Sequence, residues 1–143
     1  MAIVLTLSNH YKYQLAAKKI DLSADTLKII LMNNTFVFDK DTHATLASVT
    51  ASQLATTGGY TQNSKTLLNQ VLSEDDTNNK GKMVCSNVVW TGTGDGFGPT
   101  GALIIYNDTT TDDTVVGCAD FGTDYTVAAT ATLTIKSIEL DLV

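Results

Sequence analysis

The chain has 143 residues, and 43% of them are hydrophobic, which is enough to build the core of one ordinary domain. Its formal net charge is −6, and all nine basic residues are lysines, so the sequence contains no arginine. Because arginine is the usual partner of phosphate groups, an acidic chain without it is not expected to bind nucleic acid. The composition therefore predicts a single acidic domain, residues 1–143, with no nucleic-acid partner.

Residues 1–7 are apolar, but no basic residues precede them and the chain turns polar at Ser8, unlike a signal peptide. No stretch approaches the roughly 20 apolar residues of a membrane-spanning helix. We therefore expect no membrane partner, and a protein that stays in the cytoplasm unless it leaves within a larger assembly. This leading segment, with Ile3, Val4 and Leu5, suits pairing with a neighbouring protein's sheet edge or pairing within its own domain.

One amphipathic helix is predicted at about residues 9–20, and Ser8 or Asn9 is its expected N-cap. Apolar residues recur there at the spacing of one helix face. That face is expected to contain Tyr13, Ala16, Ala17 and Ile20.

Most of the remaining chain is predicted to form β-strands. Apolar and β-branched runs indicate strands near residues 26–32, 66–72, 82–90, 102–106, 114–121 and 130–142. The irregular excursion between the first two strands, residues 33–63, is of the kind that often carries a binding surface. The last strand changes the parity of its apolar residues, which predicts a bulge or a switch between sheets at Lys136 and Ser137.

These elements predict a mainly β fold, an antiparallel β-sandwich or distorted barrel of about seven or eight strands with one N-terminal amphipathic helix. A glycine-rich segment, residues 91–101, is similar to a phosphate-binding loop only in its glycine content. It has no lysine and precedes a strand rather than a helix, so it is expected to connect two strands. Its glycines suit the close approach of a partner's backbone.

The sequence offers few groups for catalysis or metal binding. His10 and His43 are the only imidazoles, and neither lies in a motif for a serine or cysteine nucleophile. The run containing Asp39, Asp41 and His43 is typical of a turn, with adventitious calcium as the alternative. We therefore expect no enzyme, no catalytic residue, no cofactor and no metal site.

The two cysteines, Cys85 and Cys118, lie far apart in the sequence, each within an apolar strand-like segment. This spacing does not fit a structural zinc site. The residues predict two buried, reduced thiols, with a cross-strand disulfide as the alternative.

A series of short motifs follows in a distinctive order along nearly the whole chain. After the helix come IDLSADTLKIIL (residues 20–31), DTH (41–43), GYT (59–61), VVW (88–90), ALIIYND (102–108) and VGCADFG (116–122). In this order the chain resembles a family of small virion proteins of tailed bacteriophages, some of which are capsid decoration (cement) proteins. The resemblance implies a location in the virion without indicating which part, after synthesis in the host cytoplasm.

Our leading hypothesis is a non-enzymatic decoration protein at the head surface, which binds the outer head surface and stabilises the expanded shell through many symmetry-related contacts. Its expected partners are the major capsid protein and copies of itself, as a trimer or dimer. The alternative is a tail-tip or fibre module that binds a host receptor or glycan through exposed aromatic residues such as Tyr60 and Phe97. The candidate interface residues are Ile3, Val4, Leu5, Phe36, Phe38, Tyr60 and Phe97.

Overall fold

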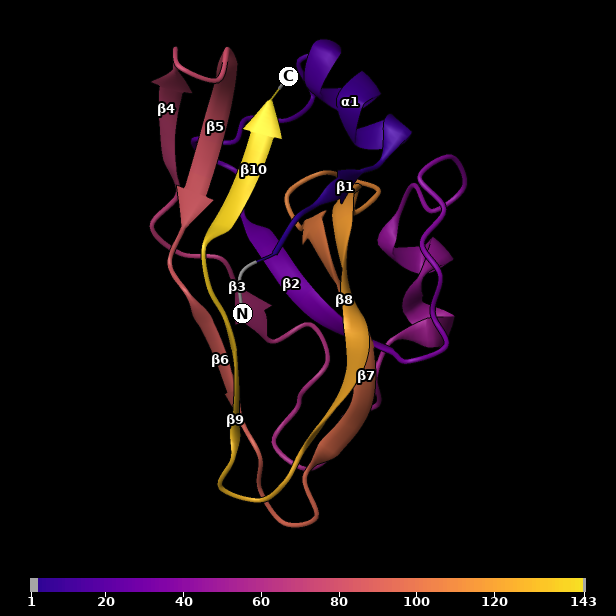
Figure 1. Cartoon of the computed structure of the whole chain (residues 1–143). Coiled ribbons are helices and arrows are strands. Elements are labelled where there is room, and N and C mark those ends of the chain that lie inside the picture. Colours follow the sequence, from indigo (N-terminus) through magenta and orange to yellow (C-terminus); the bar gives the residue numbers. More distant parts are fainter. Residues whose placement is uncertain (1–2, 143) are drawn as a thin grey trace.

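The computed structural model describes residues 3–142 and is mainly β, with 46% of residues in strands and 10% in helices. Antiparallel sheets face one another in a sandwich-like arrangement, and one helix lies at the end where the leading segment joins (Figure 1). The predicted fold class is therefore confirmed. Within the described residues, no helix is long and apolar enough to cross a membrane.

Helix α1 is Asn9–Ala16, and two short 3-10 helices, η1 and η2, are Leu46–Ser48 and Thr50–Ser52. The strands are β1 (Thr6–Leu7), β2 (Leu27–Asn33), β3 (Lys65–Thr66), β4 (Val71–Asp75), β5 (Lys80–Cys85), β6 (Val88–Thr91), β7 (Phe97–Asn107), β8 (Val115–Val127), β9 (Thr132–Ile135) and β10 (Ile138–Leu142).

One layer is a five-stranded antiparallel sheet in the order β1-β8-β7-β2-β3. Strand β2 lies deep within it, with Ile29 opposite Ile105 and Ile30 opposite Ile104 on β7. All four of these isoleucines are buried, although successive residues of a strand point to opposite faces. Both faces of this sheet are therefore covered.

The other layer is a long two-part ribbon, in which β10-β5-β4 form one sheet and β6-β9 form another. Cys85 pairs with Ile138 before the junction, and Val88 pairs with Ile135 after it, so two residues intervene on each strand. Ser137, one of these intervening residues, has a left-handed φ of 54°. The predicted switch between sheets at Lys136 and Ser137 is confirmed, and the opposite strand, predicted as continuous, breaks with it.

Two hydrophobic clusters fill the spaces on either side of the five-stranded sheet. The larger lies between this sheet and the ribbon, and includes Leu31, Leu103 and Trp90. The smaller lies on the outer face, where Ile104 packs with Val49 beneath the excursion. The excursion therefore acts as a third layer over the sheet.

Helix α1 ends at Ala16, four residues earlier than predicted. Ser8 is its N-cap, as expected: its Oγ accepts from the Tyr11 backbone N–H at 3.0 Å and donates to the Val115 carbonyl oxygen at 2.6 Å. This anchor turns Tyr11 into the core and leaves Tyr13 66% exposed. The predicted apolar face is therefore wrong, because the tertiary contact of the cap, rather than the helical period, orients this short helix.

Two predicted strand boundaries are also wrong. The strand expected at residues 66–72 is two strands, because the chain there crosses from β2, which pairs with β3, to β5, which pairs with β4. The glycine-rich connection is limited to residues 92–96, because Thr91 belongs to β6 and residues 97–101 belong to β7. Irregular pairing with β8 from Phe97 to Ala102 accommodates the glycines within a strand.

Candidate functional site

Residues 3–7 of the leading segment lie along the molecule, and the last two of them pair with its own domain. Thr6 is opposite Cys118 and Leu7 is opposite Gly117, so β1 forms an edge of the five-stranded sheet. Ile3 and Leu5 are half-buried against the main core, whereas Val4 is 88% exposed. Pairing within the domain therefore begins at Thr6. Ile3, Val4 and Leu5, for which pairing with a neighbour or within the domain was expected, form no strand, and Ala2 lies outside the described residues.

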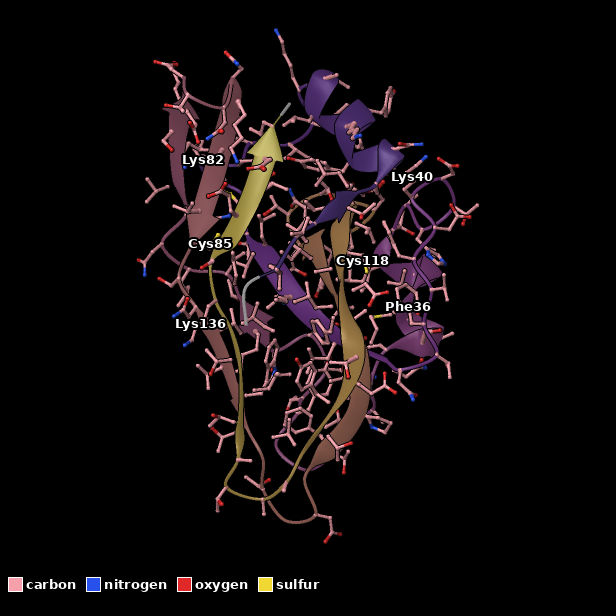
Figure 2. All side chains as sticks on the ribbon, viewed as in Figure 1. Phe36, Lys40, Lys82, Cys85, Cys118 and Lys136 are labelled. Carbon is pink, nitrogen blue, oxygen red and sulfur yellow. The ribbon has the colours of Figure 1, made fainter. Side chains whose placement is uncertain are left out.

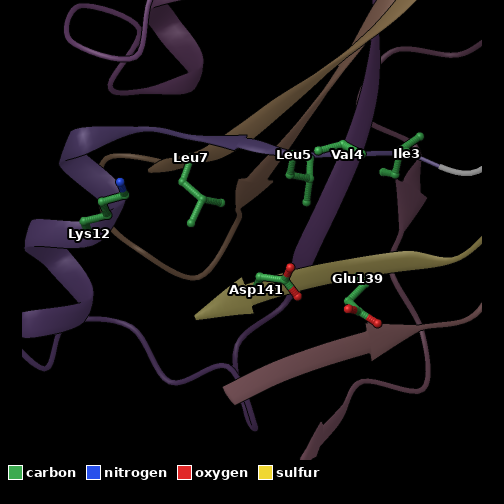
Figure 3. A pocket seen from close by; sticks show the side chains of 7 residues that line it. All are labelled: Ile3, Val4, Leu5, Leu7, Lys12, Glu139 and Asp141. Atoms are coloured by element: carbon green, nitrogen blue, oxygen red, sulfur yellow. The ribbon is translucent and has the colours of Figure 1, made fainter. Parts of the chain in front are cut away.

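Between the leading segment and β10 the surface is hollowed, and we call this groove the α1–β10 furrow. Its first part has a volume of about 460 Å³, with Leu5, Leu7 and Lys12 on one side and Glu139 and Asp141 of β10 on the other (Figure 3). Two further hollows, of about 410 and 430 Å³, continue it beneath α1 toward β4. The hollow of about 410 Å³ shares Leu7 and Lys12 with the first part of the furrow. It shares Leu15 and Leu142 with the hollow of about 430 Å³.

The strand side of the furrow carries a compact charge network. Lys80 Nζ lies 2.7 Å from Glu139 Oε1 and 2.7 Å from Asp141 Oδ1. Lys82 Nζ lies 3.5 Å from Asp75 Oδ2 and 3.7 Å from Glu139 Oε2. The hydrogen bond from Lys80 is the main reason that the pKa of Asp141 is lower than usual. Asp141 is therefore ionised at neutral pH, and Lys80 holds both carboxylates of β10 in place.

The helix side of the furrow contains a buried hydroxyl group. Tyr11 is fully buried and lines the furrow, and its hydroxyl has no hydrogen-bond partner among the described residues. Burial raises the pKa of this phenol, so the hydroxyl remains a neutral donor. An unpaired buried donor is costly in a native protein and calls for an acceptor.

Two of the predicted interface residues are buried. Tyr60 is 2% exposed and Phe97 is 3% exposed, and their ring centroids lie 6.0 Å apart. The Tyr60 hydroxyl accepts hydrogen bonds from the Leu31 backbone N–H and from Gln53 Nε2, both at 3.1 Å. Their prediction as surface contacts is wrong, because aromatic residues beside glycine turns here close the core. The receptor-binding alternative loses the two aromatic residues on which it was based.

Phe36 and Phe38 are half-buried in the excursion, packed against the cluster on the outer face of the five-stranded sheet. Figure 2 labels Phe36. The imidazole of His43 is stacked on Phe36 at 5.2 Å and lies 5.8 Å from Phe38. His43 Nδ1 accepts a hydrogen bond from the Asp39 backbone N–H at 3.0 Å. These contacts hold the excursion on the sheet and leave only Val37 between the two phenylalanines, 80% exposed.

The remaining polar candidates form structural contacts. His10 Nε2 lies 2.7 Å from Asp112 Oδ2, and Thr114 donates to the other oxygen of that carboxylate at 2.6 Å. Partial burial acts to raise the pKa of Asp112, but these hydrogen bonds outweigh it and lower the pKa. Asp39 accepts from the Asp41 backbone N–H at 2.9 Å, as expected for a turn. No group of three metal-binding side chains occurs within residues 3–142.

The cysteines are free thiols on different sheets, Cys85 on β5 and Cys118 on β8 (Figure 2). Burial raises the pKa of the Cys85 thiol to about 11, and burial together with Asp120 raises that of Cys118 to about 12. The prediction of reduced thiols is confirmed, although Cys85 is only half-buried.

The strand side of the furrow was not predicted from the sequence. The signal was present in β10, where Glu139 and Asp141 alternate with buried leucine and isoleucine, but it did not show that the strand lies at an edge. Tyr11 was missed because the helical period pointed to Tyr13. Comparison of the chain with protein-family models, curated proteins and solved structures found no match.

Proposed function

We propose that the protein is a non-enzymatic structural component of a bacteriophage virion, a decoration protein that binds the outer head surface and stabilises the expanded shell. The observation that carries this proposal is the placement of exposed apolar side chains on a well-packed β body. They lie in the leading segment (Val4), in the excursion (Val37), just before β4 (Leu68) and on β4 (Val71 and Leu72).

These positions face different directions. The excursion and β4 lie on opposite sides of the molecule, with the leading segment between them (Figure 1). A protein that sits among several neighbours covers apolar groups on several sides at once, whereas a small-molecule site gathers them in one cavity. Each contact is small, and repetition over a symmetric shell multiplies their effect on shell stability.

The motif order of the sequence supports the same proposal through its resemblance to virion proteins of tailed bacteriophages. The net charge of −6 supports a position away from the packaged DNA, since like charges repel. The major capsid protein and further copies of this chain are the proposed partners.

The test is co-sedimentation of the purified protein with tailless, expanded heads of the phage that encodes it. We expect saturation on the order of hundreds of copies per head and a higher temperature of head disruption. Val37→Asp and Val71→Asp change exposed side chains on opposite sides, and each is expected to lower the bound copy number without changing the melting temperature of the free protein. Lys136→Gln, on an exposed residue at the ribbon bend, lowers the net charge by the same one unit and is the control for the change in charge.

Absence of binding to expanded heads would contradict the proposal. Saturation at only a few copies per head would contradict it too, and would favour the tail-tip or fibre module.

A further inference from the structure

We propose that the α1–β10 furrow binds an extended strand of the capsid protein, in which lysine or arginine alternates with apolar residues, by adding it to the free edge of β10. The identity of the partner rests on the proposed function. The chemistry of the strand rests on the furrow itself.

The backbone of β10 provides the first requirement, a free sheet edge. Ile138 to Leu142 pair with β5, and within residues 3–142 no other strand pairs with β10. Its unpaired side borders the furrow, across from β1, which is the edge of the other layer (Figure 3). An extended peptide placed there gains main-chain hydrogen bonds from β10 and covers the space between the two layers.

The side chains of β10 define the charge of this strand. On its paired edge β10 lies beside β5, where lysine alternates with other residues (Lys80, Gly81, Lys82, Met83). Lys80 contacts both Glu139 and Asp141. The side chains of Glu139 and Asp141 remain 33% and 47% exposed. A second strand with the same alternation, added on the free side, places its cations beside these carboxylates.

The same charges argue against another copy of this chain as the occupant. Strand β4, the second free edge of this sheet, carries Glu74 and Asp75. Pairing β10 with β10 of a second copy brings Glu139 and Asp141 against their own counterparts. Because like charges opposite one another destabilise a sheet, neither free edge of this sheet in a second copy fits the furrow, and the proposed strand comes from a different protein.

The deeper part of the furrow provides apolar contacts and one hydrogen-bond donor. Leu7, Leu15 and Leu142 line it together with Tyr11, whose hydroxyl is buried and has no hydrogen-bond partner among residues 3–142. A peptide whose docking opens this wall supplies the carbonyl oxygen that this hydroxyl lacks. An extended peptide therefore satisfies the edge of β10, its carboxylates and Tyr11 together.

The probe is a fluorescein-labelled peptide of sequence TKVKVKVT, titrated with the full-length protein and followed by fluorescence anisotropy. Its matched control, TEVEVEVT, has the same apolar alternation and the opposite charge. We expect saturable binding of the lysine peptide at least tenfold tighter than that of the glutamate peptide. Equal binding of the two peptides, or no saturable binding of either, would overturn the proposal.

Two variants separate the furrow from general attraction to an acidic surface. Ala16 lines the furrow and is exposed, so Ala16→Trp fills the groove, whereas Ala17→Trp places the same ring one residue later. We expect Ala16→Trp to weaken binding at least tenfold and Ala17→Trp to leave it unchanged. Equal affinities of the two variants would place the peptide elsewhere and overturn the proposal.

Tyr11→Phe supplies a readout that a purely structural residue does not give. Because the free protein loses an unpaired buried hydroxyl, its melting temperature is expected to rise while its affinity for the lysine peptide falls severalfold. The head-binding experiment tests the proposed function, and the peptide experiment tests the furrow, so either proposal can fail without the other. Head binding without peptide binding removes the furrow and retains the proposed function, whereas peptide binding without head binding retains the furrow and removes the capsid as partner.

Discussion

Strands β2 and β4 show how different two strands of one small protein can be. β2 is buried along almost its whole length, because the ribbon covers one face of its sheet and the excursion covers the other. β4 lies at a free edge, and four of its five residues are exposed, including Val71 and Leu72. The five-stranded sheet therefore carries the stability of the fold, whereas the edges of the ribbon are available for contacts.

The largest expected effect comes from truncating the two faces of the central sheet. Leu103 and Ile104 are neighbours on β7 that are fully buried in different clusters. We expect Leu103→Ala and Ile104→Ala each to lower the free energy of unfolding by about 2–5 kcal/mol, measured by urea denaturation. Val71→Ala on β4 is the control, with an expected change within about 0.5 kcal/mol. A loss below 1 kcal/mol for Ile104→Ala would show that the excursion does not form a third layer.

The next effect probes the far end of the molecule, where the two layers meet. A Cβ atom at Gly58 would lie 1.7 Å from the Gly96 carbonyl oxygen, and the Gly58 φ is +55°. Gly94 has the same φ, but no atom lies within 4 Å of its Cβ position. We expect Gly94→Ala to cost about 1 kcal/mol through its φ alone and Gly58→Ala to cost more. Equal losses in thermal unfolding would contradict the close packing of these loops.

Tyr11→Phe is expected to stabilise the isolated protein. The hydroxyl of Tyr11 is buried without a partner among residues 3–142, and removing such a group relieves an uncompensated desolvation cost, here about 1 kcal/mol. Differential scanning calorimetry measures the melting temperature. The comparison is Tyr106→Phe, which removes the hydroxyl of a buried tyrosine in the outer cluster. A lower melting temperature for Tyr11→Phe would mean that the hydroxyl has an acceptor in solution.

The smallest effect concerns the charge network of the ribbon. Because the folded-state pKa of Asp141 lies below its unfolded value, its contribution to stability is present at neutral pH and is lost as pH falls from about 4 through the folded pKa. Hydrogen bonds to Asp141 and Glu139 raise the pKa of Lys80, so the lysine contribution is lost only at strongly alkaline pH.

Lys80→Met is therefore expected to lower the stability slightly at pH 7 and to flatten its decline below pH 4. Lys12→Met removes a lysine from the opposite wall, where no ion pair to it occurs among residues 3–142, and is expected to leave that decline unchanged. Chemical denaturation between pH 2.5 and 7 measures both variants. An unchanged acid decline in Lys80→Met would contradict a stabilising role for the network.

Local patterns predicted the fold class and several elements correctly. The parity change after Ile135 is a property of one strand, and it correctly located the bend at Lys136 and Ser137. The Ser8 cap is likewise a local feature. The apolar face of the helix was not predictable from its period, because the contact between Ser8 and Val115 joins residues 107 positions apart.

The candidate site was less predictable than the fold. Whether Tyr60 and Phe97 are exposed depends on how two distant glycine turns pack together, which no local pattern records. The acidic alternation of β10 is visible in the sequence, but its position at an edge follows only from the strand order. The furrow is formed by residues from both ends of the chain, so only the folded structure brings its two walls together.

The bend of the ribbon has a consequence for how this protein can change in length. Two residues separate the paired strands on each side of the bend, so the same register continues across it. A single inserted residue on one side shifts β10 against β5 and moves Glu139 to the face now occupied by buried side chains. A matched insertion on both sides preserves every pair. The segments around residues 86 and 136 are therefore expected to gain or lose residues together, as a compensated pair, over evolution.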